Sequence, residues 1–128
     1  MNIKFERLAD LFDDDIVQEM LRYAEPKQCH HNAAIICVEF DDWGCIDYCE
    51  GYYAGICGHA FNCYNDYNGN KHYFDVTQEL HVLNGFINDS EFIKDAQLVT
   101  TFKNGTDAIK KFNMCGESKL LTVERKLK

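Results

Sequence analysis

Apolar residues near the start of the chain recur every three or four positions, which is the period of an amphipathic helix. The series consists of Phe5, Leu8, Phe12, Ile16, Met20 and Ala24. A run of aspartates at positions 13–15 interrupts it. We therefore expect a short first helix in a helical stretch that starts at Ile3, and then a second helix that ends near Ala24, with Asp15 and Gln18 forming a capping box.

A further helical pattern covers residues 29–40, after Pro26 has separated it from the preceding helix. One face of this helix carries Cys29, Asn32, Ala33, Ile36, Cys37 and Phe40. The thiol of Cys29 is therefore expected to point inward. An Ala-Ala pair on the first turn leaves room for strands to approach closely, and residues 41–44 are expected to end the helix.

Aromatic and β-branched residues separated by turn residues then predict strands over 45–53, 58–64 and 71–76. The pair Asn68-Gly69 indicates a hairpin between the last two strands. A loop over 65–69 would pair Tyr64 with Asn70 and place His59 opposite Asp75. In that register His59, Phe61 and Cys63 share one face, which we expect to be buried against the helix that starts at Cys29.

The remainder of the chain predicts a strand over 97–102, a helix over 106–114 and a final strand over 120–125. The expected fold class is therefore α+β, with N-terminal helices packed on a mostly antiparallel sheet. A length of 128 residues is typical of a single domain, so we expect one domain over 1–128.

Charge and composition narrow the classes of partner. The net charge of −8 disfavours binding to a phosphate backbone, so no nucleic-acid partner is expected. No apolar run is long enough to span a membrane, and the N-terminus does not resemble a signal peptide, which favours a cytoplasmic protein without a membrane partner. In that compartment the seven cysteines are expected to be free thiols.

Cys29, His59 and Asp75 occur in an order and setting that suit a catalytic triad. A helix start and a nearby imidazolium both stabilise a thiolate, and a carboxylate can fix the imidazole in its useful tautomer. The backbone N–H of Cys29 is suited to stabilise an oxyanion, and Gln28 or Asn32 could supply a side-chain donor. These residues predict acyl transfer through an acyl-enzyme on Cys29, with no cofactor.

The same residues resemble the core of the transglutaminase-like and papain-like cysteine hydrolases. CHHNA at 29–33 is similar to a Cys-x-x-Asn-Ala helix start in small bacterial and phage proteins of this type, HAFN at 59–62 to their histidine strand, and FDVT at 74–77 to their aspartate strand. The match covers about the middle two-fifths of the chain, and Phe61 replaces the usual tryptophan. The resemblance implies a papain-like or transglutaminase-like fold and a cysteine hydrolase, thiol protease or acyltransferase acting on a protein or peptide substrate.

Two other functions fit the sequence. Dense cysteine and histidine residues between 29 and 63 could hold zinc, but only Cys45 and Cys49 have a suitable spacing, and they lie in an expected strand, so no metal site is expected. A non-catalytic factor, such as one encoded by a phage, could keep the fold and bind a protein through its acidic surface. The other histidines, at 30, 31, 72 and 81, are expected at the surface or around the triad. Glu50 could line the cleft, but its place before Gly51 favours a solvated strand position.

Overall fold

The computed structural model describes residues 1–53 and 57–103 of the chain. Within these residues five strands and four α-helices follow one another in the order β1 (Asn2–Lys4), α1 (Leu8–Leu11), α2 (Asp14–Tyr23), α3 (Cys29–Glu39), β2 (Ile46–Tyr53), β3 (Cys57–Asn65), β4 (Lys71–Phe74), α4 (Val76–Leu83) and β5 (Asp95–Phe102). Short 3₁₀ turns occupy Asp41–Trp43 and Asp89–Glu91. The expected α+β class is confirmed.

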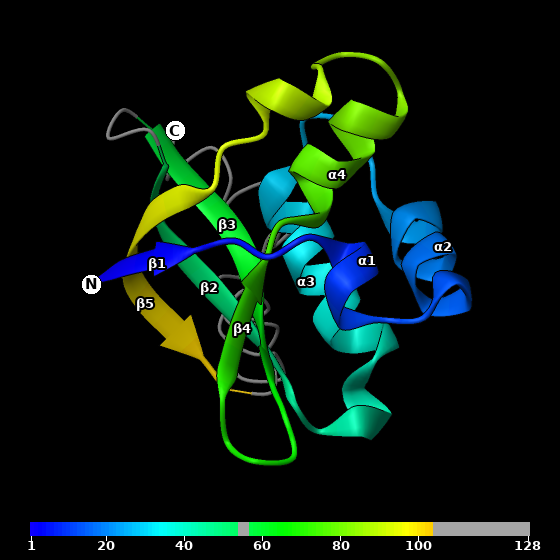
Figure 1. Cartoon of the computed structure of the whole chain (residues 1–128). Helices are drawn as coiled ribbons and strands as arrows, with labels where there is room; N and C mark the ends of the chain where they lie inside the picture. The colour runs from blue at the N-terminus through cyan, green and yellow to red at the C-terminus, as the bar shows by residue number, and fades with distance from the viewer. Residues whose placement is uncertain (54–56, 104–128) are drawn as a thin grey trace, which may run out of the picture.

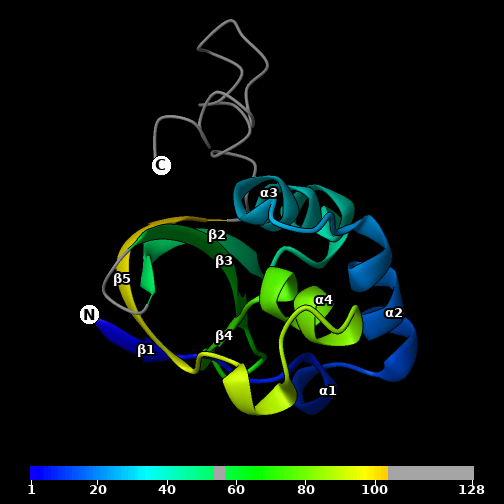
Figure 2. The same cartoon turned by 90° about the horizontal axis from the view of Figure 1, so that it is seen from above.

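The strands form one sheet in the order β1-β5-β2-β3-β4, and every neighbouring pair is antiparallel. The sheet curls until its two edges approach each other, so that it is nearly barrel-shaped (Figures 1 and 2). Phe5, just after β1, forms a parallel bridge with Tyr73 in β4, and the Glu6 N–H donates to the Tyr73 carbonyl at 2.8 Å. These contacts join the first strand to the last one in the sheet order.

Two apolar clusters lie on opposite faces of the curved sheet. The outer cluster joins α3 to β2 and β3, and its fully buried members include Ala34, Ile36, Ile46, Tyr48, Ala60 and Phe74. The inner cluster fills the concave face with Ile3, Phe5, Cys49, Phe61, Cys63, Tyr73, Phe92 and Ala96. The helix α3 therefore rests on the outside of the sheet, where Figure 2 shows it above β2 and β3.

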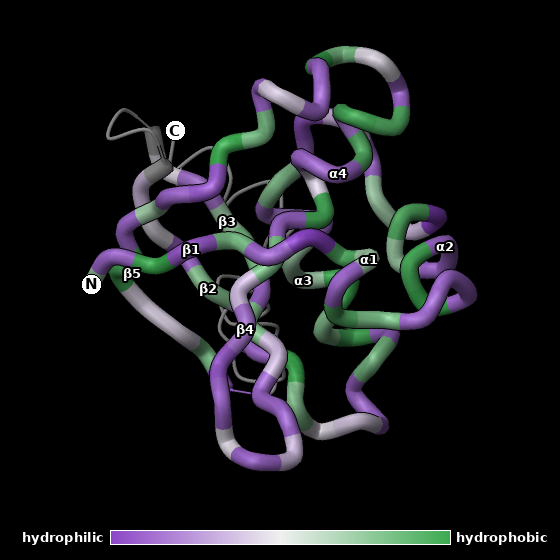
Figure 3. Tube along the Cα trace, viewed as in Figure 1, coloured by the Kyte–Doolittle hydropathy of each residue, from purple (hydrophilic) through white to green (hydrophobic). Residues whose placement is uncertain are grey.

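The N-terminal segment differs from the expected helical stretch. Ile3 lies in the strand β1 and points into the inner cluster, because its backbone pairs with β5 through Ala96. The expected interruption by aspartates is confirmed, but Asp13 rather than Asp15 precedes α2, and its side chain makes no capping hydrogen bond. Both hydrophilic and hydrophobic stretches occur along α2, as expected of an amphipathic surface helix (Figure 3).

Other expected elements within the described residues are confirmed, except that the strand expected over 71–76 ends at Phe74 and is followed by a helix. The helix expected over 29–40 is α3, and Gly44, with a φ of 65°, follows the short turn that ends it. The expected strands up to 74 and over 97–102 are present, but α4 was not predicted. The expected helix over 106–114 and strand over 120–125 lie outside the described residues. No helix within residues 1–53 and 57–103 has the length and hydropathy to cross a membrane.

Candidate active site

The segment before α3 holds the first turn of that helix in place. The side chain of Asn32 accepts a hydrogen bond from the Glu25 N–H at 2.8 Å, and its amide donates to the Glu25 carbonyl at 2.8 Å and to Thr77 Oγ1 at 3.0 Å. The Lys27 N–H donates to Nε2 of His81 on α4 at 3.1 Å. Cys29, the first residue of α3, is thereby fixed between the preceding loop and α4, with 7% of its surface exposed.

His59 and Asp75 meet in the interior of the protein. Nε2 of His59 and Oδ2 of Asp75 are 2.7 Å apart, and both side chains are buried. A carboxylate only accepts hydrogen bonds, so Nε2 carries the proton that it donates to Asp75. The second carboxylate oxygen, Oδ1, accepts a hydrogen bond from the backbone N–H of Gln78 at 3.3 Å. Asp75 is therefore both the partner of His59 and the N-cap of α4.

The predicted contact between these residues forms, but the predicted register is wrong. Tyr64 pairs with His72 rather than with Asn70, and β4 ends at Phe74, so Asp75 lies in no strand. Extending the observed register by one residue would place Phe61, not His59, opposite Asp75. His59 reaches the carboxylate because the chain turns into α4 at Asp75, and the cap position directs one oxygen into the helix and the other toward β3.

The predicted burial of the histidine face is also wrong in part. Phe61 and Cys63 point into the inner cluster, away from α3. Residues of the opposite parity face the helix: Ala60 packs in the outer cluster, and the Asn62 amide donates to the carbonyl of Ala33 at 2.9 Å. Successive side chains of a strand point to opposite faces of the sheet. Phe61 is buried on the concave face and not on the face that α3 covers, so its aromatic character did not identify the helix-covered face.

Cys29 and His59 nevertheless interact, and each changes the ionisation of the other. Burial alone would raise the pKa of Cys29, but hydrogen bonds with His30 and His59, and then the positive charge of His59, lower its pKa to about 6. Burial alone would lower the pKa of His59, but the charge and hydrogen bond of Asp75, together with the hydrogen bond and charge of Cys29, raise its pKa to about 10. Between these values the pair is a thiolate and an imidazolium.

His30 belongs to the site itself, whereas the sequence predicts a position at the surface or around the triad. Its Nδ1 lies 3.3 Å from the sulfur of Cys29, and the residue is completely buried. Its other ring nitrogen, Nε2, is buried without a hydrogen-bond partner. The signal that could have found it is the spacing of His30, Ala34 and Cys37, which follows the i, i+4, i+7 pattern of a second buried stripe on α3.

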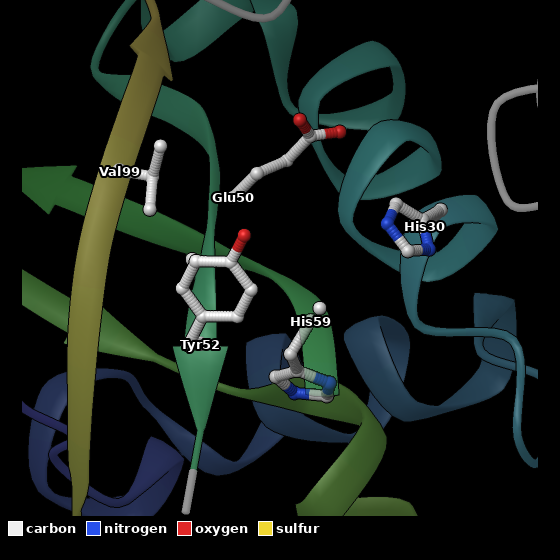
Figure 4. Close-up of a pocket in the computed structure, with 7 residues that line it drawn as sticks. His30, Glu50, Tyr52, His59 and Val99 are labelled. Carbon is white, nitrogen blue, oxygen red and sulfur yellow. The ribbon is translucent and has the colours of Figure 1, made fainter. Parts of the chain in front are cut away.

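A pocket with a volume of about 80 Å³ opens beside these two histidines. It is lined by His30, Glu50, Gly51, Tyr52, Gly58, His59 and Val99, and Figure 4 shows Glu50 and Tyr52 on β2 across from His30 on α3. Glu50 thus lines the pocket, a position that the sequence reading had ranked below a solvated one. Gly51 allows β5 to pass close by, because a Cβ at this position would lie 2.0 Å from the carbonyl oxygen of Gln97.

The two side chains predicted to donate a hydrogen bond to an oxyanion differ in whether their amides are already engaged in hydrogen bonds. The amide of Asn32 is occupied by Glu25 and Thr77, as described above. Gln28 precedes the first residue of α3, is half-buried, and makes no side-chain capping bond. Backbone N–H groups in the first turn of a helix have no intrahelical acceptor, so this end of α3 can offer donors to an anion.

The remaining predicted site features involve metals and other thiols. Among the residues that the structure describes, no group of three or more His, Cys, Asp or Glu side chains is arranged to hold a metal ion. Free thiols are present at Cys29, Cys37, Cys45, Cys49 and Cys63. His72 forms ion pairs with Glu6 at 2.7 Å and Asp66 at 2.8 Å, far along the hairpin from the triad.

Comparison with protein-family models, with curated proteins and with solved structures gave no match to this chain. The geometry of the site itself is therefore the basis for inferring a function.

Proposed function

We propose that this protein is a small cysteine hydrolase or acyltransferase that acts on an amide or thioester bond through an acyl-enzyme on Cys29. The observation that carries the proposal is the buried 2.7 Å contact of His59 with Asp75, on a histidine whose interaction with Cys29 lowers the pKa of that thiol. A nucleophile, a base beside it and a third group that orients the base are the features that covalent catalysis requires. Three unrelated core residues would have no reason to form a chain of contacts from Cys29 to His59 and from His59 to Asp75.

The reaction begins with attack of the Cys29 thiolate on a carbonyl carbon, whose π electrons move to the oxygen. When the C=O bond re-forms, the bond to the amine or thiol breaks, and the leaving group takes a proton from His59. Nδ1 is the nitrogen that exchanges this proton, because Nε2 is bonded to Asp75. Water or a second nucleophile then attacks the thioester, returns its proton to His59 and releases the thiolate.

The oxyanion formed in each step needs hydrogen-bond donors that are already in place. We assign this role to the backbone N–H of Cys29 and the side chain of Gln28, since the amide of Asn32 serves to hold the loop before α3. The role of Asn32 is then to position the nucleophile rather than to contact substrate. Aligned peptide dipoles of α3 add positive potential at the same end of the helix.

The resemblance to transglutaminase-like and papain-like proteins supports the same function. That resemblance leads us to expect a cysteine at a helix start and a histidine and an aspartate on neighbouring strands. Here Cys29 begins α3, His59 lies in β3, and Asp75 directly follows β4, which pairs with β3. We propose a protein or peptide as the substrate and a papain-like or transglutaminase-like core as the ancestry of the fold.

A simple activated ester tests the proposal without knowledge of the natural substrate. With p-nitrophenyl acetate we expect a burst of nitrophenol and a single acetyl group on Cys29, located by peptide mass mapping, followed by slow turnover as water cleaves the thioester. Cys29→Ala should abolish the burst, and His59→Ala should slow both phases. Acetylation that is spread over several residues, or that persists in Cys29→Ala, would contradict an acyl-enzyme at this position.

A non-catalytic binding protein is the second candidate, and the low exposure of Cys29 favours it. Only 7% of the residue is exposed, whereas a nucleophile must meet its substrate. The pocket is lined by His30 and His59, which both interact with Cys29, but Cys29 itself is not among its lining residues. The two functions separate in the ester experiment, because a binding protein would show no burst and would keep its partner affinity after Cys29→Ser.

A further inference from the structure

The pocket beside the two histidines contains polar atoms that the described part of the chain does not satisfy. Nε2 of His30 is buried without a hydrogen-bond partner. In Glu50, Oε2 accepts a hydrogen bond from the Tyr48 hydroxyl at 2.6 Å, whereas Oε1 bonds to no described residue. A buried polar atom without a partner is rare and costly in a folded protein, so the His30 nitrogen at this pocket indicates a ligand, to which the second oxygen of the half-buried Glu50 is also available.

The contact between His30 and Cys29 determines what the free nitrogen can do. A thiolate accepts hydrogen bonds, so Nδ1 of His30 carries the proton in their 3.3 Å contact. Nε2 of the neutral ring is then an acceptor. The carboxylate of Glu50 is a second acceptor, and it is negatively charged. The pocket therefore suits a group that supplies several N–H donors together with a positive charge.

The walls and the size of the pocket fit the same type of group. Tyr52 is 52% exposed and extends from the same strand as Glu50, so the face of its ring can contact a cation. A volume of about 80 Å³ exceeds the roughly 10–15 Å³ that one water needs, and holds the head group of a side chain. The net charge of −8 adds a long-range attraction for cations.

We propose that this pocket binds the ammonium or guanidinium group of a basic substrate side chain next to the carbonyl that Cys29 attacks. The inference depends on the function proposed above, since it assigns the substrate class of the same site. Glu50 supplies the charge, and Nε2 of His30 accepts a hydrogen bond from the bound group. His59 lines the same pocket, which keeps the bound side chain close to the reacting thiol.

Dipeptidyl chloromethyl ketones that differ only in the residue next to the ketone test this inference. The Cys29 thiolate forms an S–C bond and chloride leaves, so the labelling rate reports how well each side chain is accommodated. With lysine, norleucine and glutamate at that residue, we expect the lysine probe to react at least about tenfold faster than the norleucine probe, and the glutamate probe to be slowest. The ratio of the lysine rate to the norleucine rate is the readout.

Glu50→Gln should reduce this ratio to about one, because the shape of the pocket remains while its charge is lost. His30→Phe should lower the ratio in part, since the ratio cancels any change in the reactivity of Cys29 itself. Asp42→Asn is the matched control: it removes one exposed negative charge on the short turn after α3 and should leave the ratio unchanged.

The outcomes distinguish this inference from the function on which it depends. Equal rates for the lysine and norleucine probes, a faster glutamate probe, or a ratio that survives Glu50→Gln would overturn the basic subsite while selective labelling of Cys29 still supports the enzyme. Absence of selective labelling of Cys29 by every probe, and by iodoacetamide, would overturn both. Titration of Cys29→Ser with lysine amide, followed through the NMR signals of His30, gives an independent result: no shift at millimolar ligand would also count against the subsite.

Discussion

The helix α3 carries one cysteine near each of its ends, and the pKa values of the two thiols are shifted in opposite directions. Cys29 and Cys37 are two turns apart on the same helix, and both are buried. Hydrogen bonds with His30 and His59 lower the pKa of Cys29 to about 6 in spite of burial. Burial raises the pKa of Cys37 well above its ordinary value, and the neighbouring Cys49 and Asp47 add to this effect.

The difference shows that burial on a helix face does not by itself make a cysteine either reactive or inert. The Cys37 sulfur accepts a hydrogen bond from the Asn62 amide at 3.4 Å and contacts the Ile46 carbonyl at 3.8 Å, and neither partner carries a positive charge. Cys29 has the first-turn N–H groups and two imidazole rings beside it. A cationic partner at the end of the helix is therefore what favours the thiolate at one of two buried cysteines.

The largest expected effect is the selectivity of alkylation between these two thiols. At pH 6.5 we expect iodoacetamide to modify Cys29 at least about a hundredfold faster than Cys37, because only the thiolate reacts. The Cys29 rate should rise with pH through about 6 and then become constant, since the thiol is already ionised above its pKa. Peptide mapping of protein quenched at successive times measures each rate.

Cys45 controls for accessibility in the same experiment. It is more exposed than Cys29, but burial and Asp47 raise the pKa of its thiol. If accessibility decided the rates, Cys45 would react first. The difference between Cys29 and Cys37 could then not be attributed to the pKa values of their thiols. In urea the three thiols should react at similar rates.

The second largest expected effect is a loss of stability when Asp75, the partner of His59 near the Cys29 end of α3, is replaced. Asp75→Ala removes the partner of a buried histidine and the cap of α4, so we expect a loss of about 3 kcal/mol in the free energy of unfolding. Asp75→Asn keeps an oxygen for the cap and should cost less. Urea unfolding followed by circular dichroism measures both variants.

The pH dependence of this loss has a defined sign. The pKa of His59 in the folded protein is raised to about 10, above its value in the unfolded chain of about 6.5. The stabilisation by Asp75 is therefore fully present below about pH 6.5 and is lost as the pH rises through about 10. The difference between the wild type and Asp75→Ala should shrink over that range, and a difference that grows with pH would contradict a charged His59.

Local patterns in the sequence were sufficient for α3 and for the presence of the hairpin. The stripe from Cys29 to Cys37 has the helical period over its whole length, and Asn68-Gly69 marks the loop. The loop is five residues long, as predicted, but runs over 66–70 instead of 65–69, because the Asp66 N–H donates to the Asn70 carbonyl at 2.9 Å and Asn65 pairs with Lys71. Side chains in the loop decide between registers that the alternation of the strands leaves open.

Other parts of the site depend on tertiary contacts that local patterns do not contain. The segment Asp75-Val76-Thr77 has strand propensity, yet it starts α4, because the Asp75 carboxylate caps Gln78 and the Gln78 side chain exchanges hydrogen bonds with the backbone of Ile93 at 2.7 and 2.9 Å. The pairing of His59 with Asp75 was thus predicted from a strand register that does not occur. The contact between His59 and Asp75 nevertheless forms. The hairpin register is shifted by two residues from the predicted one, and Asp75, as the N-cap of α4, turns its carboxylate toward His59.

A smaller effect is expected when one histidine is removed from the reactive end. His59→Ala should lower the iodoacetamide rate of Cys29 at pH 6 by about tenfold, because the imidazolium that favours the thiolate is lost and the pKa of the thiol rises. The rate should recover at pH 9. His31→Ala, which removes a half-buried histidine from the same helical turn, is the matched control and should change the rate little. A Cys29 rate that is indifferent to His59→Ala would assign the ionisation of this thiol to His30 and the helix end instead of His59.

The smallest effect separates the structural role of one cysteine from the chemical role of the other. Cys37→Ala removes a sulfur atom that packs against Asn62 and Ile46, so we expect it to lower the free energy of unfolding by about 1 kcal/mol and to leave the labelling of Cys29 unchanged. Cys29→Ala should abolish labelling at the active end and change stability less, because it also removes a buried charge that interior packing does not favour. Urea unfolding of both variants at pH 7 measures this difference. A larger loss of stability in Cys29→Ala than in Cys37→Ala would show that the thiolate contributes more to the fold than the packing of α3 does.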